Sequence, residues 1–367
     1  MFVQQIMQTT EITGIPRATT FTNADLVSGR KIHPLKAVHT YDASDFETFI
    51  HEWMIGHLKK EGKYKSIYKL GGANDKGRDI LAFVDANKTI VDYYQCKHYD
   101  APLTPSDVWV EMGKLCVHTY TKQIPFPRKY YFLAPRDIGP KLSDLLQGDK
   151  DVLRQQLIKN WTKYCENSIS SSSIPLDKPL LAYISKMDFD VFETKPILEI
   201  IQEHSGTVWA PFRFGGGLKM RSSVSETPSM IHIRENQYIH QLLLGYAQRI
   251  KKTILKVVDL LPYNKESSHL IRQRNAFYSA EHLRIHARES LPEEHDEFEK
   301  LKKDVFDGVI NTVEKEYADP IEKVDAVVDR AMELPTEGNL LSGQIRTLDK
   351  HGVCHHLVND GKIHWKL

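Results

Sequence analysis

An aspartate, a glutamine and a lysine stand at a spacing that suits phosphodiester hydrolysis. Asp79 follows a glycine-rich turn over residues 71–77, Gln95 comes sixteen residues later, and Lys97 lies two residues beyond Gln95. Hydrolysis of a phosphodiester needs a cation that neutralises developing charge and activates the attacking water. A lysine can orient that water or stabilise the pentavalent phosphorus. The pattern therefore predicts a metal-dependent phosphodiesterase site.

Magnesium prefers oxygen ligands, usually one or two carboxylates with waters and substrate oxygens. The predicted metal ligands are Asp79, the side-chain oxygen of Gln95, the backbone carbonyl of Cys96 and, as a second carboxylate, Glu47. Mg²⁺ is the expected cofactor, and Mn²⁺ could replace it. Gln95 stands where many such sites carry an acid. Taken alone, Asp79 and Lys97 would be better explained as a surface ion pair. The glycine turn, the hairpin spacing and the preceding helix with Glu47 together reverse that preference.

Two strands of a hairpin are expected to position these residues. Residues 80–84 are apolar, and residues 89–96 are rich in β-forming types, with turn-forming residues between them. Gln95 and Lys97 have the same strand parity, so their side chains share one face. Pairing of the two strands can bring Asp79 opposite them.

A helix before the turn supplies the second carboxylate. Asp42 is a helix-capping residue type. The apolar residues that follow recur at helical spacing: Phe46, Phe49, Ile50 and Trp53. At 100° per residue, Glu47 lies nearer the edge of this apolar face than Glu52 does, which favours Glu47 as the site residue. A solvated glutamate at the helix edge is the alternative.

The same half of the chain predicts an α/β core, a mixed sheet flanked by helices. A helix is expected to start near Thr104, and residues 129–134 read as a further buried strand. The segment Phe212–Leu218 contains three consecutive glycines and marks a boundary between a domain at 1–218 and a helical domain at 225–367. Because these glycines lack the Lys-Ser/Thr of a phosphate loop, a nucleotide-hydrolysing protein is disfavoured.

The second half is expected to be mainly α-helical. Apolar residues recur every three or four positions from Ile239 to Leu261 and predict one long helix. Three more helices are expected at residues 267–290, 294–317 and 320–333. Asn359-Asp360-Gly361 is typical of a hairpin turn, so the tail is expected to form a small β-hairpin around Trp365. Residues 354–356, Cys-His-His, have no second ligand pair at zinc spacing and are expected to pack in the core.

Composition and charge predict an ordinary globular protein. The 367 residues are 41% hydrophobic and 26% charged, as in an ordinary globular protein. A net charge of +1 does not favour a strong non-specific nucleic-acid binder, although local patches can bind phosphate. The four cysteines are widely spaced and read as reduced thiols. With no signal sequence and no apolar run near the roughly 20 residues of a membrane span, a soluble cytoplasmic protein is expected.

Three segments together resemble a known family. Phe46-Glu47, the turn ending at Asp79, and Tyr94-Gln-Cys-Lys97-His resemble the Mrr-type branch of the PD-(D/E)xK restriction-endonuclease-like superfamily. The resemblance implies a restriction-endonuclease-like fold and a double-stranded DNA endonuclease. It also implies a site made of Glu47, Asp79, Gln95 and Lys97. The stretch from Glu47 to the turn is a few residues longer than the family pattern, which leaves Glu52 as a rival.

The rest of the chain carries a second resemblance. Segments 212–218, 272–283 and 352–359 resemble the C-terminal module of effector subunits in ABC-three-component bacterial defence systems, of which Lamassu is the best known. The effector nuclease of those systems resembles the endonuclease domain of CBASS effectors. The resemblance implies an SMC-like ATPase that restrains the nuclease until it senses foreign DNA, a small third subunit, and a helical half that docks partners and forms homo-oligomers. A catalytically degraded, nucleic-acid-binding or scaffold subunit is the alternative, since Gln95 replaces an acid.

Overall fold

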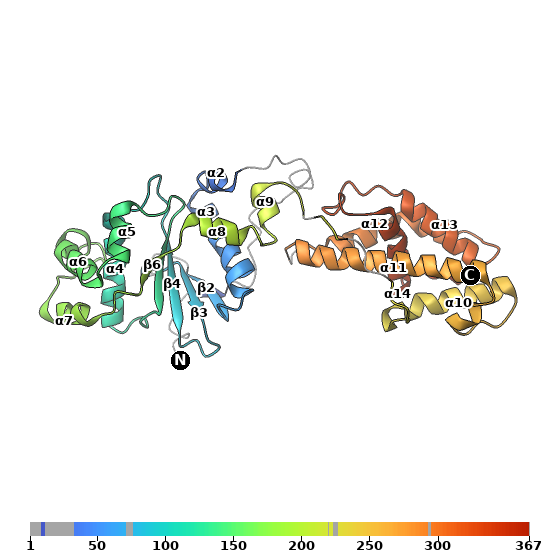
Figure 1. The fold of residues 1–367 in the computed structure, drawn as a ribbon, viewed down its shortest axis with the longest axis horizontal. Coiled ribbons are helices and arrows are strands. Elements are labelled where there is room, and N and C mark those ends of the chain that lie inside the picture. The colour runs from blue at the N-terminus through green and yellow to red at the C-terminus, as the bar shows by residue number, and fades with distance from the viewer. Residues whose placement is uncertain are drawn as a thin grey trace. The chain divides into compact units, whose positions relative to one another are not determined.

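The computed structural model describes residues 9–11, 33–70, 76–218, 220–222, 227–292 and 295–366. The described residues fall into two compact units, one ending at Gly215 and the other starting at Gly216 (Figure 1). The expected glycine turn lies largely outside the described residues, because positions 71–75 are not among them. Within the described residues, every helix is too short or too polar to cross a membrane.

A six-stranded sheet forms the centre of the N-terminal unit, and its strands lie side by side in chain order. The strands are β1 (Thr9–Glu11), β2 (Ser66–Leu70), β3 (Ile80–Phe83), β4 (Val91–Cys96), β5 (Lys129–Leu133) and β6 (Phe192–Thr194). Strands β1 to β4 are antiparallel neighbours, whereas β5 and β6 are added in parallel. The β3–β4 hairpin pairs Ile80 with Tyr94 and Phe83 with Val91. The predicted hairpin and mixed sheet are therefore confirmed.

Helices cover both faces of this sheet (Figure 1). One face carries α4 (Pro105–Tyr120), α5 (Pro140–Gln147), α6 (Lys150–Tyr164) and α7 (Lys178–Lys186). The other face carries α2 (Pro34–Val38), α3 (Ala43–Trp53) with a π-helical turn at Met54–Lys59, α8 (Ile197–His204) and α9 (Ala210–Phe214). Leu81 and Tyr93 belong to the core under α4, whereas Ile80 and Tyr94 belong to the core under α3. Alternate residues of each strand thus serve opposite faces.

Local sequence explains where the two helices nearest the strand ends begin. The Asp42 carboxylate accepts the backbone N–H of Asp45 at 2.8 Å and caps α3. Thr104 and Asp107 form a reciprocal capping box at the start of α4, with Pro105 in its first turn. Both predicted helix starts are confirmed.

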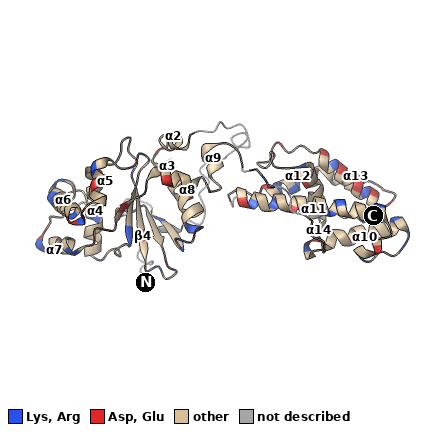
Figure 2. Cartoon of the chain, in the orientation of Figure 1, with Lys and Arg blue, Asp and Glu red and all other residues tan. Residues whose placement is uncertain are grey.

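The C-terminal unit is helical, as expected. It contains short 3-10 turns at Ile233–Glu235 and Val257–Leu260, and the helices α10 (Asn236–Ile250), α11 (Asn264–Ser290), α12 (Glu297–Val313), α13 (Pro320–Glu333) and α14 (Thr347–Asn359). Helix α14 is the core element, with residues 351–358 all buried. Acidic and basic residues are interspersed along α11, α12 and α13, which is typical of solvated, salt-bridged faces (Figure 2).

The expected long helix from Ile239 to Leu261 is wrong. Helix α10 ends at Ile250 because Lys251 adopts a left-handed conformation with φ 56°. The apolar spacing continues beyond this point, but its members have different environments: Ile254 is 3% exposed and Leu261 is 71% exposed. Part of the apolar spacing there falls on surface residues, which a pattern of residue types cannot distinguish from a buried seam.

The expected hairpin at the tail is also wrong. Asn359 is the last residue of α14, and Gly361 follows with φ +69°, the left-handed position that glycine commonly fills after a helix. Trp365 is fully buried, as expected, and its indole N–H donates to His355 at 3.2 Å. Cys354 and His355 are fully buried, so their packing role is confirmed.

Buried histidines make the C-terminal unit sensitive to acid. Burial lowers the pKa of His351 to about 4 and that of His356 to about 4. Because the unfolded chain binds protons near pH 6.5, stability is complete above that pH and is lost as pH falls from about 6.5 towards 4. We expect about 1–2 kcal/mol lost per histidine at pH 5, measured by urea unfolding at pH 5 and pH 7.5.

A His351→Gln variant should show a smaller pH effect, because one titrating group is gone. His240→Gln, at an exposed position, serves as the control and should keep the wild-type pH dependence. Equal unfolding free energies at the two pH values would contradict the prediction.

Candidate functional site

Asp79 and Gln95 meet at the paired ends of β3 and β4. The backbone N–H of Asp79 donates to Tyr94 at 2.9 Å, which fixes Asp79 at the start of β3. The Asp79 carboxylate then accepts two hydrogen bonds on one oxygen, from Gln95 Nε2 at 2.7 Å and from the backbone N–H of Cys96 at 2.6 Å. The structure therefore brings these two predicted site residues into direct contact.

The side-chain oxygen of Gln95 is buried and has no hydrogen-bond partner among the described residues. The Gln95 amide nitrogen faces two acceptors, the Asp79 carboxylate and, at 3.3 Å, the Cys96 carbonyl. Without a bound cation, exchanging the amide oxygen and nitrogen would therefore place the amide oxygen against these two acceptor oxygens. An unpaired buried oxygen is costly unless a donor or a cation faces it. The amide nitrogen, rather than this oxygen, faces the Asp79 carboxylate and the Cys96 carbonyl, so the three oxygens could bind one cation together only after the Gln95 amide turns over.

Side chains alone do not build a closed metal centre here. Within the described part of the chain, three or more His, Cys, Asp or Glu side chains nowhere come together as a metal-binding group. This is compatible with Mg²⁺, which keeps several waters and takes few protein ligands. It is not compatible with the closed four-ligand geometry of structural zinc.

Lys97 lies next to an acid that the sequence did not single out. Its ammonium donates to Glu111 of α4 at 2.6 Å, and Lys114 of the same helix reaches Glu111 at 3.0 Å. Burial alone would raise the pKa of Glu111, but Lys97 and then Lys114 outweigh it and lower that pKa. Gly77, with φ +79°, lies so close that an added Cβ would come within 2.6 Å of the Glu111 carboxylate. The Lys97 ammonium is thus held by a charged, largely buried partner.

Glu111 could have been noticed from the sequence. It lies between Val108 and Met112 on α4, where the apolar spacing of the helix expects a core residue, and it is 5% exposed. A charged residue on an otherwise buried helix face needs a partner. What the sequence does not reveal is that the partner is Lys97.

Replacing Lys97 with alanine should raise the pKa of Glu111. The burial that opposes its ionisation would remain, whereas the largest favourable charge would be lost. The Lys114→Ala variant is the matched control and should raise that pKa less, since Lys114 contributes less than Lys97. NMR titration of ¹³C-labelled glutamate carboxyls measures both. An unchanged Glu111 titration in Lys97→Ala would contradict this account of the pair.

Glu47 comes from α3, which covers the face of the sheet opposite α4, near the same ends of β3 and β4. It forms an ion pair with Lys69 of β2 at 3.1 Å, and both side chains are partly exposed. Burial, followed by the charges of Asp79 and Glu47, raises the pKa of the Cys96 thiol well above its usual value. Both carboxylates therefore lie near Cys96, although Glu47 comes from α3 rather than from the hairpin.

Glu52, the rival for the helix position, is committed elsewhere. It is 3% exposed, and its carboxylate accepts a hydrogen bond from the Arg213 guanidinium of α9 at 2.8 Å. Its other oxygen lies 2.8 Å from Nε2 of His204 on α8. Hydrogen bonds from His204 and Arg213 hold the pKa of Glu52 below its usual value, against the effect of burial. This network ties α3 to α8 and α9, which is a structural role.

Basic residues gather beside Lys97. Arg78 is buried with its guanidinium 4.9 Å from the centre of the Tyr93 ring. Burial lowers the pKa of His118 on α4 to about 4, with further lowering by the charges of Lys76, Arg78 and Lys114. Because the charges of three cations act on His118, this side of the strand ends is locally positive, although the net charge of the whole chain is near zero.

Comparison with known proteins bears on the C-terminal unit. Residues 235–365 match the model of C-terminal domain 6 of the ABC-three component (ABC-3C) systems. The match begins at the turn before α10 and ends at Trp365, and it supports membership of this chain in such a multi-subunit system. No curated protein and no solved structure matches the chain.

Proposed function

We propose that the N-terminal unit is a Mg²⁺-dependent endonuclease that cuts double-stranded DNA, on a restriction-endonuclease-like fold of the Mrr type. The observation that carries the proposal is the contact of Asp79 with Gln95, whose buried side-chain oxygen has no partner among the described residues. Lys97 lies two residues further on the same face of β4 and its extension. The mixed sheet flanked by helices agrees with that fold class.

In the proposed reaction, each residue of the site has its own role. Asp79, Gln95 and the Cys96 carbonyl would hold the cation, which when bound would neutralise charge on the phosphodiester and lower the pKa of water. Glu47, by the other face of the strand ends and paired with Lys69, would supply the second carboxylate. The Lys97 ammonium, kept in place by Glu111, would stabilise negative charge developing on phosphorus. The basic residues beside Lys97 suit the phosphate backbone of DNA.

The match of the C-terminal unit supports placing this nuclease in a bacterial anti-phage or anti-plasmid system of the Lamassu kind. In this proposal the nuclease works with an SMC-like ATPase and a small third subunit. The helical unit docks those partners and supports a homo-oligomer in the active state, and the ATPase restrains cleavage until foreign DNA is sensed.

A second function is a non-catalytic DNA-binding or scaffold subunit on the same fold. Two observations favour it: the neutral Gln95 in an acid's place, and the commitment of Lys97 to Glu111 at 2.6 Å. A lysine engaged with a largely buried carboxylate is less available to a substrate than a free one. Measured cleavage separates the two functions.

The test is nicking of supercoiled plasmid by the full chain produced without other subunits. We expect cleavage with Mg²⁺ or Mn²⁺, none with EDTA, and a loss of at least about tenfold in Lys97→Ala. Lys129→Ala is the matched control, since Lys129 on β5 pairs with the partly exposed Glu193 and lies outside the site. Equal cleavage by wild type and Lys97→Ala would refute the assignment, and DNA binding without cleavage would favour the scaffold function.

A further inference from the structure

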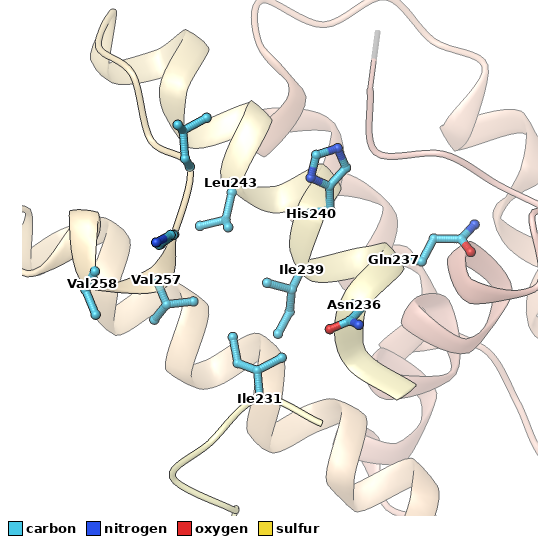
Figure 3. Close-up of a pocket in the computed structure, with 10 residues that line it drawn as sticks. Ile231, Asn236, Gln237, Ile239, His240, Leu243, Val257 and Val258 are labelled. Carbon is cyan, nitrogen blue, oxygen red and sulfur yellow. The ribbon is translucent and has the colours of Figure 1, made fainter. Parts of the chain in front are cut away.

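An open groove lies on the C-terminal unit, within the segment matched to the three-component systems. It has a volume of about 710 Å³ and runs between α10 and the segment that follows it. Figure 3 shows Ile231, Ile239, Leu243 and Val257 projecting towards one another across it. Nothing in the proposed nuclease chemistry uses this groove.

The groove has a recessed apolar floor and an exposed apolar rim. Ile239 and Leu243 on α10 are 3% and 6% exposed and form the floor. Leu255 and Val258 on the rim are 73% and 62% exposed. Large apolar side chains gathered around a hollow cost free energy in water, and such patches commonly mark interaction sites.

The dimensions suit a short helix. Of the five α10 residues that line the groove, all but Gln237 follow an i, i+3, i+4, i+7 spacing along one side of the helix: Asn236, Ile239, His240 and Leu243. At 1.5 Å per residue they span about 10 Å, close to two helical turns. An amphipathic helix places its apolar stripe in such a groove with the same spacing of anchors.

The charges around the groove are mostly positive. Residues 227–263 contain five Lys or Arg against two Asp or Glu. Lys251, Lys252 and Lys256 are exposed. The two acids are engaged internally: Glu235 is buried against Arg274, and Asp259 accepts the backbone N–H groups of residues 255 and 256. Lys256 is the charged residue among those that line the groove, so the charge at the rim is basic, which favours an acidic partner.

We propose that this groove binds a short acidic amphipathic helix of a protein partner. Its apolar stripe would cover Ile239 and Leu243 and bury Leu255 and Val258, while its acidic flank would face Lys256. A membrane surface fits less well, because the apolar floor is recessed and a bilayer cannot follow a narrow hollow. The proposal does not depend on nuclease activity.

The probe is a fluorescein-labelled, helix-stapled peptide with leucines at i, i+3, i+4 and i+7 and glutamates on its flanks. Its binding to the full chain is followed by fluorescence polarisation. Leu255→Asp and Val258→Asp should each weaken binding at least about tenfold, Lys256→Glu should weaken it as well, and wild-type binding should be stronger at low salt. Because these side chains are exposed, circular dichroism should be unchanged. Leu198→Asp, at an exposed leucine of the N-terminal unit, is the matched control.

Three results would overturn the proposal. A scrambled peptide of the same composition lacks the apolar stripe and should not bind, so equal binding by it would show that the surface recognises charge alone. Unchanged affinity in Leu255→Asp and Val258→Asp would place the peptide elsewhere. Binding to phosphatidylglycerol vesicles without binding to the peptide would assign the surface to a membrane. A nuclease assay on the same variants should show wild-type activity whichever result holds, which keeps this test separate from that of the proposed function.

Discussion

Replacing Asp79 with asparagine is expected to reduce plasmid nicking by at least about 100-fold, because the site loses its central negative charge at the point where a cation would bind. The substitution keeps the shape of the side chain. Its amide oxygen can still accept the hydrogen bonds from Gln95 and from the Cys96 backbone, which are 2.7 and 2.6 Å long in the native site. The loss should therefore be one of activity rather than of folding.

Initial nicking rates in Mg²⁺, with circular dichroism and thermal unfolding on the same samples, measure this effect. Glu193→Gln is the matched control, because it neutralises a partly exposed carboxylate of the same sheet that pairs with Lys129. It should cut at the wild-type rate. An Asp79→Asn protein that is folded and cuts within a fewfold of wild type would remove Asp79 from the proposed site.

The second large effect is expected in the C-terminal unit, where Arg221→Ala should cost about 3–5 kcal/mol of unfolding free energy. Arg221 and Asp349 are buried together, with guanidinium-to-carboxylate distances of 2.5 and 2.9 Å. Arg221 also donates to the backbone carbonyl of Ser279 on α11 at 2.8 Å. Its removal leaves the Asp349 carboxylate charged, buried and short of donors, which is more costly than losing an exposed pair.

Trp365 offers a probe for this unit, since it is the only tryptophan in the sequence after residue 216. Urea unfolding followed by ¹⁹F NMR of fluorotryptophan-labelled protein resolves it from the four tryptophans of the N-terminal unit. Arg330→Ala is the matched control, because Arg330 and Glu333 form an exposed pair at 3.3 Å that should contribute about 0–1 kcal/mol. If the Arg221 and Arg330 variants unfold at the same urea concentration, the buried pair does not stabilise the unit as argued.

Local rules were sufficient wherever the determining partners are close in sequence. Strand parity and a short turn predicted that Asp79 would meet Gln95 across the β3–β4 hairpin, and the two residues are in contact. Capping residues predicted the starts of α3 and α4. In each case the interacting groups are separated by few residues, so backbone geometry leaves little choice. The same reasoning failed after Ile250, where the apolar spacing continued although the left-handed backbone of Lys251 ends the helix.

The residue types suited to phosphodiester chemistry, and the meeting of two of them on one hairpin, could be predicted from the amino-acid sequence alone. The partners of the buried glutamates, in contrast, are known only from the three-dimensional structure. Glu52 is held by Arg213, 161 residues away, and Lys97 is held by Glu111 on a helix packed over the strand ends. Such pairings depend on which helix covers which face of the sheet. That choice is made by burial of the whole core, and no local pattern of residue types contains it.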